Sequence, residues 1–127
     1  VPLHPRTKKK LRDFGIILTT FTTEPVGYLE MLWLLSRCRL VLTDSGGIQK
    51  EAYFAGKCCV TIRDETEWVE LLEIGANYLA GANANNIIQM TKRYFGKNIF
   101  PDNNLFGAGL ASIKIAKAIK KEANNAV

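Results

Sequence analysis

Short apolar runs rich in β-branched residues alternate with helical stretches along the chain, and this alternation constrains the fold most strongly. Strand-like runs occupy residues 15–20, 39–43, 58–62 and 77–80, and helical stretches occupy residues 27–38, 46–55, 66–74, 85–95 and 108–123. Such alternation predicts parallel strands joined by right-handed helical crossovers. The near-continuous apolar character of residues 40–42 and 59–62 is typical of a sheet covered on both faces. We therefore predict the α/β class, a Rossmann-like parallel sheet with helices on both faces and residues 40–43 as a central strand.

Two of the predicted helices are amphipathic, and we expect their apolar sides to face the core. The positions expected to face inward are Leu29, Leu32, Trp33 and Leu35 in the helix at 27–38, and Ile113, Ile115, Ala116 and Ile119 in the helix at 108–123.

The length and the cysteine content limit the kinds of protein that this chain could be. A chain of 127 residues has the length of one domain. It begins without methionine and in mid-pattern, which predicts a piece of a longer protein, truncated at its N-terminus. No apolar run of about 18 residues and no signal peptide is visible, so we expect no membrane partner. Three cysteines and a single histidine without a C-x-x-C pair favour a reducing cytoplasm and argue against a metal site.

The formal net charge of +5 is concentrated at residues 6–12 and 114–121. Solvated helix faces explain such basic clusters more simply than nucleic-acid binding does. No basic motif interleaved with aromatic residues supports a nucleic-acid interface, so we expect no nucleic-acid partner.

The stretch TDSGGIQKEA at residues 43–52 leaves a predicted strand through two glycines and opens a predicted helix. Each glycine near a helix start costs up to about 1 kcal/mol relative to alanine. Exposed backbone N–H groups at Ser45, Gly46 and Gly47, together with the helix dipole, would suit a phosphate or diphosphate. Glu51 shares a helix face with Gly47 and is placed to accept hydrogen bonds from ribose hydroxyls. In the alternative, Ser45 only caps the helix, the glycines only turn the chain, and Glu51 is a solvated helix residue.

Several ordered motifs resemble the non-hydrolysing UDP-N-acetylglucosamine 2-epimerases. They begin with PRT at 5–7 and GYL at 27–29, continue with TDSGGIQKEA, GK at 56–57, RDETE at 63–67 and NYLAG at 77–81, and end with FGAGLA at 106–111. The resemblance covers nearly the whole chain at consistent spacing, which makes it more specific than any single glycine motif.

The resemblance implies a two-domain fold like that of the B-type glycosyltransferases, with UDP in the cleft between two Rossmann-like halves. Residues 1–127 match the C-terminal, UDP-binding half. The implied contacts are Ser45, Gly46 and Gly47 for the diphosphate, Glu51 for the ribose, Tyr28 and Met31 beside the uracil, and Arg63, Thr66 and Glu67 near the phosphates, with His4, Arg6, Val26 and Trp68 as possible further ligands. A structural role for His4 and a packing role for Trp68 stay open.

The family's reaction is elimination of UDP across C1–C2 of the sugar, followed by re-addition with the C2 configuration inverted. It needs a general base and a stabilised leaving group. In the family the acidic catalytic residues lie in the N-terminal half, so we expect this chain to be inactive alone. The resemblance implies no cofactor, a homodimeric full-length protein in the cytoplasm, and a role in cell-surface polysaccharide biosynthesis.

Departures from the family pattern leave the sugar open. Trp68 stands where many members carry arginine, and Ala108 and Leu110 replace an aspartate and a lysine of the closing motif. Variants that act on modified UDP-amino sugars are therefore compatible with the sequence. Two other functions stay open, a glycosyltransferase half of the same fold and a non-catalytic nucleotide-sugar-binding module.

Overall fold

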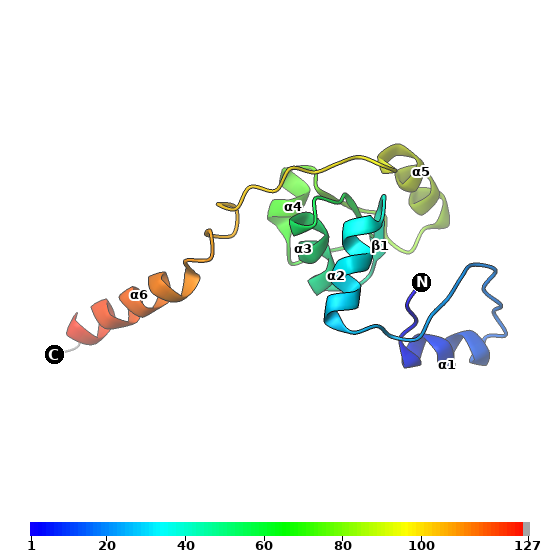
Figure 1. Cartoon of the computed structure of the whole chain (residues 1–127), viewed down its shortest axis with the longest axis horizontal. Helices are drawn as coiled ribbons and strands as arrows, with labels where there is room; N and C mark the ends of the chain where they lie inside the picture. Colours follow the sequence, from blue (N-terminus) through cyan, green and yellow to red (C-terminus); the bar gives the residue numbers. More distant parts are fainter. Residues whose placement is uncertain (126–127) are drawn as a thin grey trace. The chain divides into compact units, whose positions relative to one another are not determined.

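The computed structural model describes residues 1–125, which form two compact units, one of residues 1–38 and one from residue 39 onward. Figure 1 shows the chain coloured from its N-terminus to its C-terminus. The expectation of a single UDP-binding domain over residues 1–127 stays a prediction, and its last two residues lie outside the described part. Within residues 1–125, no helix combines the length and the apolar character that crossing a membrane requires.

The first unit contains helices α1 (Pro5–Asp13) and α2 (Tyr28–Arg37). α1 was not predicted. It begins at His4, whose Nδ1 accepts a hydrogen bond from the Arg6 N–H at 3.2 Å, and proline occupies the first helical position. α2 confirms the helix predicted at 27–38. Its start is closed by the Glu30 carboxylate, which accepts a hydrogen bond from the Gly27 N–H at 2.6 Å.

The prediction of a strand at residues 15–20 is wrong. These residues carry no strand assignment, and the Ile17 side chain is 88% exposed. Backbone pairing in this unit instead joins Thr23 to the N-terminus, where Leu3 N–H donates to the Thr23 carbonyl at 3.0 Å. A strand forms only where the backbone of a neighbouring segment exchanges hydrogen bonds with it. Residues 1–3 form such bonds with Thr23 and not with residues 15–20.

The predicted inner face of α2 is partly wrong. Leu35 is buried as expected, whereas Leu29 and Trp33 are 77% and 60% exposed. The two exposed residues are four apart, so they form a second apolar strip along the helix. This strip lies on the surface of the unit rather than in its core.

The second unit is built on a parallel three-stranded sheet of β1 (Val41–Thr43), β2 (Cys59–Thr61) and β3 (Asn77–Leu79), in the order β1-β2-β3. β2 is therefore central, and the expectation of a central strand at 40–43 is wrong, because β1 is an edge strand. All three residues of β2 are buried, so both faces of the central strand are covered.

Four helices complete the described part of the second unit. They are α3 (Gly46–Phe54), α4 (Val69–Glu73), α5 (Ala84–Tyr94) and α6 (Ala111–Asn125). α3 contacts β1 and β2, α4 contacts β3, and α5 contacts β2. These helices confirm the predicted βα alternation, although α4 starts later than expected because residues 66–68 are held in an irregular loop.

The predicted inward face of the last helix is wrong. Every residue of α6 is exposed, including the four apolar residues expected to face the core. An amphipathic pattern shows that a helix has an apolar side, but it does not specify what covers that side. No residue of α6 contributes to the core of the described chain.

The core of the second unit joins the sheet helices to the segment that follows α5. Tyr53, Leu71 and Ala76 are buried at its centre, and Trp68 and Phe106 are among the residues that pack against them. The Tyr53 hydroxyl accepts a hydrogen bond from the Asp102 N–H at 2.6 Å. This core lies directly behind the loop that precedes α4.

Removing the side-chain cap of α5 should destabilise the chain modestly. The Asn83 side-chain oxygen accepts a hydrogen bond from the Asn86 N–H at 3.0 Å at the helix start. Asn83→Ala is expected to lower the free energy of unfolding by about 1 kcal/mol in urea denaturation. Asn85→Ala, at an exposed position inside the same helix, is the matched control. Equal losses in the two variants would show that the cap contributes nothing.

Candidate functional site

Two irregular segments meet at the carboxyl edge of the sheet. The turn at residues 44–45 follows β1, and the loop at residues 62–68 follows β2. In parallel sheets ligands bind beyond this edge. Ser45 occupies the N-cap of α3 with extended backbone angles, and its side chain makes no capping hydrogen bond. The structure therefore does not support the alternative in which the Ser45 side chain only caps the helix.

Gly46 and Gly47 are the first two residues of α3, so their N–H groups have no acceptor within the helix. A Cβ atom at Gly47 would meet nothing within 4 Å, which leaves the backbone there open to close approach. A Cβ atom at Gly46 would instead collide with the carboxylate of Glu67. The two glycines therefore differ, since Gly46 accommodates a neighbouring side chain and Gly47 faces open space.

An ion pair lies beside this helix start. Arg63 Nη1 is 3.1 Å from Glu67 Oε2, and the Glu67 carboxylate packs against Gly46. A negative group at a helix N-terminus is electrostatically favourable. The structure thus brings Arg63 and Glu67 together beside the glycine turn, and their expected place near the phosphates stays a prediction.

Thr66 and Trp68 of the same loop point toward protein groups. Thr66 Oγ1 donates a hydrogen bond to Gln49 Oε1 at 2.6 Å, and Trp68 Nε1 donates to the Gly46 carbonyl at 2.8 Å. The Trp68 ring packs edge-on against Phe106, with centroids 5.8 Å apart. Lys50 Nζ lies 4.6 Å from the Trp68 ring centroid, within cation–π range. Trp68 therefore has the packing role that the sequence left open. It also donates a hydrogen bond to the glycine turn.

Sequence reasoning missed two buried polar residues behind the turn, Gln49 and Asn77. Gln49 is 0% exposed and Asn77 is 1% exposed, and Asn77 Nδ2 donates to Gln49 Oε1 at 2.8 Å. Asn77 in turn accepts a hydrogen bond from Thr61 Oγ1 at 2.7 Å. The available signal was spacing, because Gln49 lies three and four residues before Ala52 and Tyr53 on the buried side of α3.

Glu51 lies in the second turn of α3 and is half-buried. Helical spacing places it on the same side as Gly47, one turn farther from the strand end. The structure thus keeps Glu51 on the helix that carries the glycine turn.

The remaining predicted site residues belong to the first unit. His4 caps α1, which confirms a structural role for its side chain, and Arg6 supplies the N–H that His4 accepts. Val26 lines an apolar hollow of about 520 Å³ with Phe21, Leu29 and Trp33 among its other walls. Tyr28 is exposed and Met31 is half-buried on α2.

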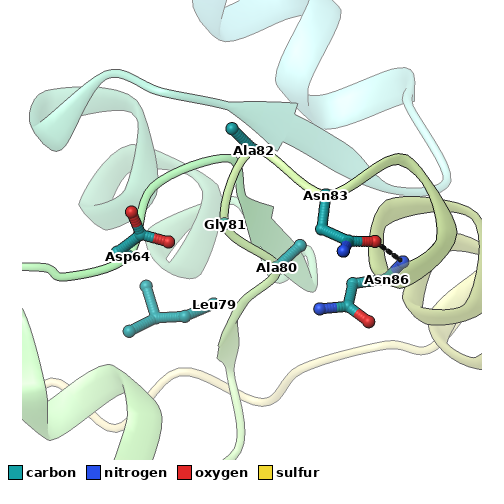
Figure 2. A pocket seen from close by; sticks show the side chains of 7 residues that line it. All are labelled: Asp64, Leu79, Ala80, Gly81, Ala82, Asn83 and Asn86. Carbon is teal, nitrogen blue, oxygen red and sulfur yellow. Dashed lines mark hydrogen bonds between the residues drawn. The ribbon is translucent and has the colours of Figure 1, made fainter.

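A further hollow of about 420 Å³ opens where β3 ends and α5 begins. Figure 2 shows Asp64 on one side of Gly81 and the amides of Asn83 and Asn86 on the other. Gly81 has φ +63°, and its N–H donates to the Arg63 carbonyl at 3.2 Å, which links this hollow to the loop before α4. No site residue predicted from the sequence lines it. Its amide and carboxylate groups offer hydrogen bonds to a polar ligand.

The arrangement around α3 suits the binding of an anion. It combines unbonded helix N–H groups, an open approach at Gly47 and a guanidinium at Arg63. Within residues 1–125, no three histidine, cysteine, aspartate or glutamate side chains gather into a group that could hold a metal ion.

Comparison with known proteins adds an independent finding. A family model described as UDP-N-acetylglucosamine 2-epimerase matches residues 1–120. The chain is 53% identical, over 95% of its length, to a UDP-2,3-diacetamido-2,3-dideoxy-D-glucuronate 2-epimerase of Pseudomonas aeruginosa, and covers 34% of that protein. It is 39% identical, over 92% of its length, to the UDP-N-acetylglucosamine 2-epimerase of Methanocaldococcus jannaschii, and covers 33% of that protein.

Solved structures of UDP-GlcNAc 2-epimerases also match this chain. The crystal structure of the Methanocaldococcus jannaschii UDP-GlcNAc 2-epimerase in complex with UDP-GlcNAc and UDP matches with a TM-score of 0.81 and 38% identity. The match covers 94% of this chain and 34% of that chain. The chain thus spans about a third of the length of the relatives it matches.

Proposed function

Since this chain belongs to the UDP-N-acetylglucosamine 2-epimerase family, we propose that it is the nucleotide-binding half of a UDP-sugar 2-epimerase. The observation that carries the proposal is the start of α3, where Gly47 leaves open approach to unbonded N–H groups beside Arg63. A diphosphate fits these donors and this charge. Support also comes from the relative whose structure holds UDP-GlcNAc and UDP.

The proposed reaction of the whole enzyme converts UDP-N-acetylglucosamine into UDP-N-acetylmannosamine. A base removes the C2 proton while the C1–O bond to UDP breaks, which leaves a C1=C2 double bond in the sugar. UDP then adds back to C1, and a proton returns to the opposite face of C2. The N–H groups of Gly46 and Gly47 and the guanidinium of Arg63 would stabilise the negative charge on the departing diphosphate.

The other parts of the proposed site follow from the resemblance to the family. We propose Ser45 as a further phosphate donor, Glu51 as acceptor for the ribose hydroxyls, and Val26, Tyr28 and Met31 for the uracil. Thr66, Glu67 and Trp68 border the phosphates in this proposal, and Arg6 is a further candidate. The catalytic base is expected in an N-terminal Rossmann-like half that completes the enzyme. We further propose a homodimer that acts in the cytoplasm and supplies cell-surface polysaccharide biosynthesis.

A second candidate concerns the sugar. Identity to the relative named for a 2,3-diacetamido-2,3-dideoxy-D-glucuronate is 53%, against 43% and 39% for the relatives from Methanococcus maripaludis and Methanocaldococcus jannaschii, which are named for UDP-N-acetylglucosamine. The departure at Trp68 from the family pattern described above is compatible with a modified sugar. Turnover of both UDP-sugars by the full-length enzyme decides between them. Preference for the diacetamido uronate would assign the second substrate, and transfer of sugar to an acceptor would favour a glycosyltransferase instead.

Titration of this chain with UDP tests the proposal directly. We expect weak but saturable binding in isothermal titration calorimetry, because the diphosphate turn and Glu51 are present while the other half of the cleft is not. A chain that is folded by circular dichroism and does not bind UDP at millimolar concentration would contradict the proposal.

Replacing the Glu51 carboxylate by an amide should weaken UDP binding. A charge-assisted hydrogen bond to ribose would be lost, so Glu51→Gln is expected to cost about 1–3 kcal/mol of binding free energy by calorimetry. Glu73→Gln, at an exposed position of α4, is the control. Inorganic diphosphate, which has no ribose, should bind both variants and the unaltered chain equally. A matching loss for diphosphate would rule out the ribose contact.

A further inference from the structure

The turn at residues 45–47 is held from behind by a buried side chain that the proposed function does not use. Gln49 Nε2 donates a hydrogen bond to the Ser45 carbonyl at 3.3 Å. Gln49 Oε1 accepts hydrogen bonds from Thr66 Oγ1 at 2.6 Å and from Asn77 Nδ2 at 2.8 Å. One fully buried amide therefore contacts the turn, the loop before α4 and the strand β3.

The carbonyl of Gly46 is held by the same loop. Trp68 Nε1 donates to it at 2.8 Å, and the Trp68 backbone N–H donates to Thr66 Oγ1 at 3.1 Å. The Thr66 hydroxyl thus donates a hydrogen bond to Gln49 and accepts one from the Trp68 backbone. Two consecutive carbonyls of the turn, those of Ser45 and Gly46, are each fixed by a side chain of this group.

Fixing these carbonyls also fixes the N–H groups that would meet a ligand. A peptide unit is planar and trans, so its C=O and its N–H point in opposite directions. The Ser45 carbonyl shares a peptide plane with the Gly46 N–H, and the Gly46 carbonyl shares one with the Gly47 N–H. Because both carbonyls are bonded on the protein side, both N–H groups are directed away from it.

We propose that Gln49 is a positioning residue that presents the Gly46 and Gly47 N–H groups to the diphosphate of a UDP-sugar. It acts through the Ser45 carbonyl and through Thr66, and it does not touch the ligand. This inference rests on the proposed function. Preorganised donors bind an anion more tightly than donors that must first be ordered.

Gln49→Met tests the inference, since methionine has a similar length and makes none of these hydrogen bonds. The variant is expected to bind UDP about tenfold more weakly, while its affinity for uridine, which has no phosphate, changes less than about twofold. Affinities are measured by NMR titration of the whole chain, and circular dichroism checks the fold. Gln89→Met, at an exposed position of α5, is the matched control and should leave both affinities unchanged.

If Gln49 had a purely structural role, its loss would lower the affinities for UDP and for uridine by the same factor. The ratio of the two affinities therefore distinguishes a positioning role from a structural one. Thr66→Val, which removes the hydroxyl bonded to Gln49, should lower the same ratio, and its effect should not add to that of Gln49→Met. If Gln49→Met does not fold, Thr66→Val decides alone by the same criterion. An unchanged ratio in the folded variants overturns the inference while UDP binding by the unaltered chain still stands. Failure of the unaltered chain to bind UDP overturns both.

Discussion

The Gly47→Val variant is expected to fold normally and to bind UDP at least about 100-fold more weakly than the unaltered chain. A Cβ atom at this position meets nothing within 4 Å, so the added side chain does not disturb the protein's own packing. It projects instead into the space from which a phosphate must reach the N–H groups of the first helical turn. Calorimetry with UDP measures the loss, and thermal unfolding checks the fold.

A valine at the same position of another helix provides the control for this variant. Asn85 is the second residue of α5, as Gly47 is of α3, and it is exposed. Asn85→Val should leave UDP binding unchanged. If Gly47→Val kept the affinity of the unaltered chain, the diphosphate would have to bind elsewhere, and the start of α3 would lose its assigned role.

The second large effect is the absence of chemistry in this chain alone. We expect it to incorporate no deuterium at C2 of UDP-N-acetylglucosamine in D2O, because turnover needs a C2 base and a closed cleft as well as nucleotide binding. The Glu67 carboxylate, which packs against Gly46, is already paired with Arg63. Proton NMR of the sugar measures exchange, and the full-length enzyme serves as the positive control.

Exchange at C2 by the isolated chain would move the base into this half of the enzyme. The candidates would then be His4, Asp64 and Glu67. His4→Gln, Asp64→Asn and Glu67→Gln, assayed one at a time, would identify the residue responsible.

The position of the glycine turn, between the end of β1 and the start of α3, was predictable from local sequence. A strand followed by Ser45, two glycines and a helix specifies its own geometry, because the glycines leave the helix start accessible and the strand places it at the sheet edge. The pairing of Arg63 with Glu67 was not deduced from spacing, but both residues were expected beside the turn. The parallel sheet likewise followed from the alternation of apolar runs with helices.

What could not be predicted depends on contacts distant in sequence. Residues 15–20 have a strand-like composition, yet a strand needs a partner that composition does not specify. The basic run of α1 suggested only a solvated face, although lysine and arginine are good helix formers. Gln49 has a polar side chain in an otherwise ordinary helix, and only the position of Thr66 and Asn77 in space shows why it is buried.

The hydrogen bond from Trp68 to the Gly46 carbonyl gives the chain an intrinsic optical probe. The chain has two tryptophans. Trp33 is 60% exposed, so its emission is accessible to a soluble quencher such as acrylamide. The Trp68 indole is half-buried, lies under the Lys50 ammonium and is bonded to the turn itself. With Trp33→Phe, the remaining tryptophan fluorescence comes from an indole attached to the helix start, so ligand arrival at that helix can be followed without a label.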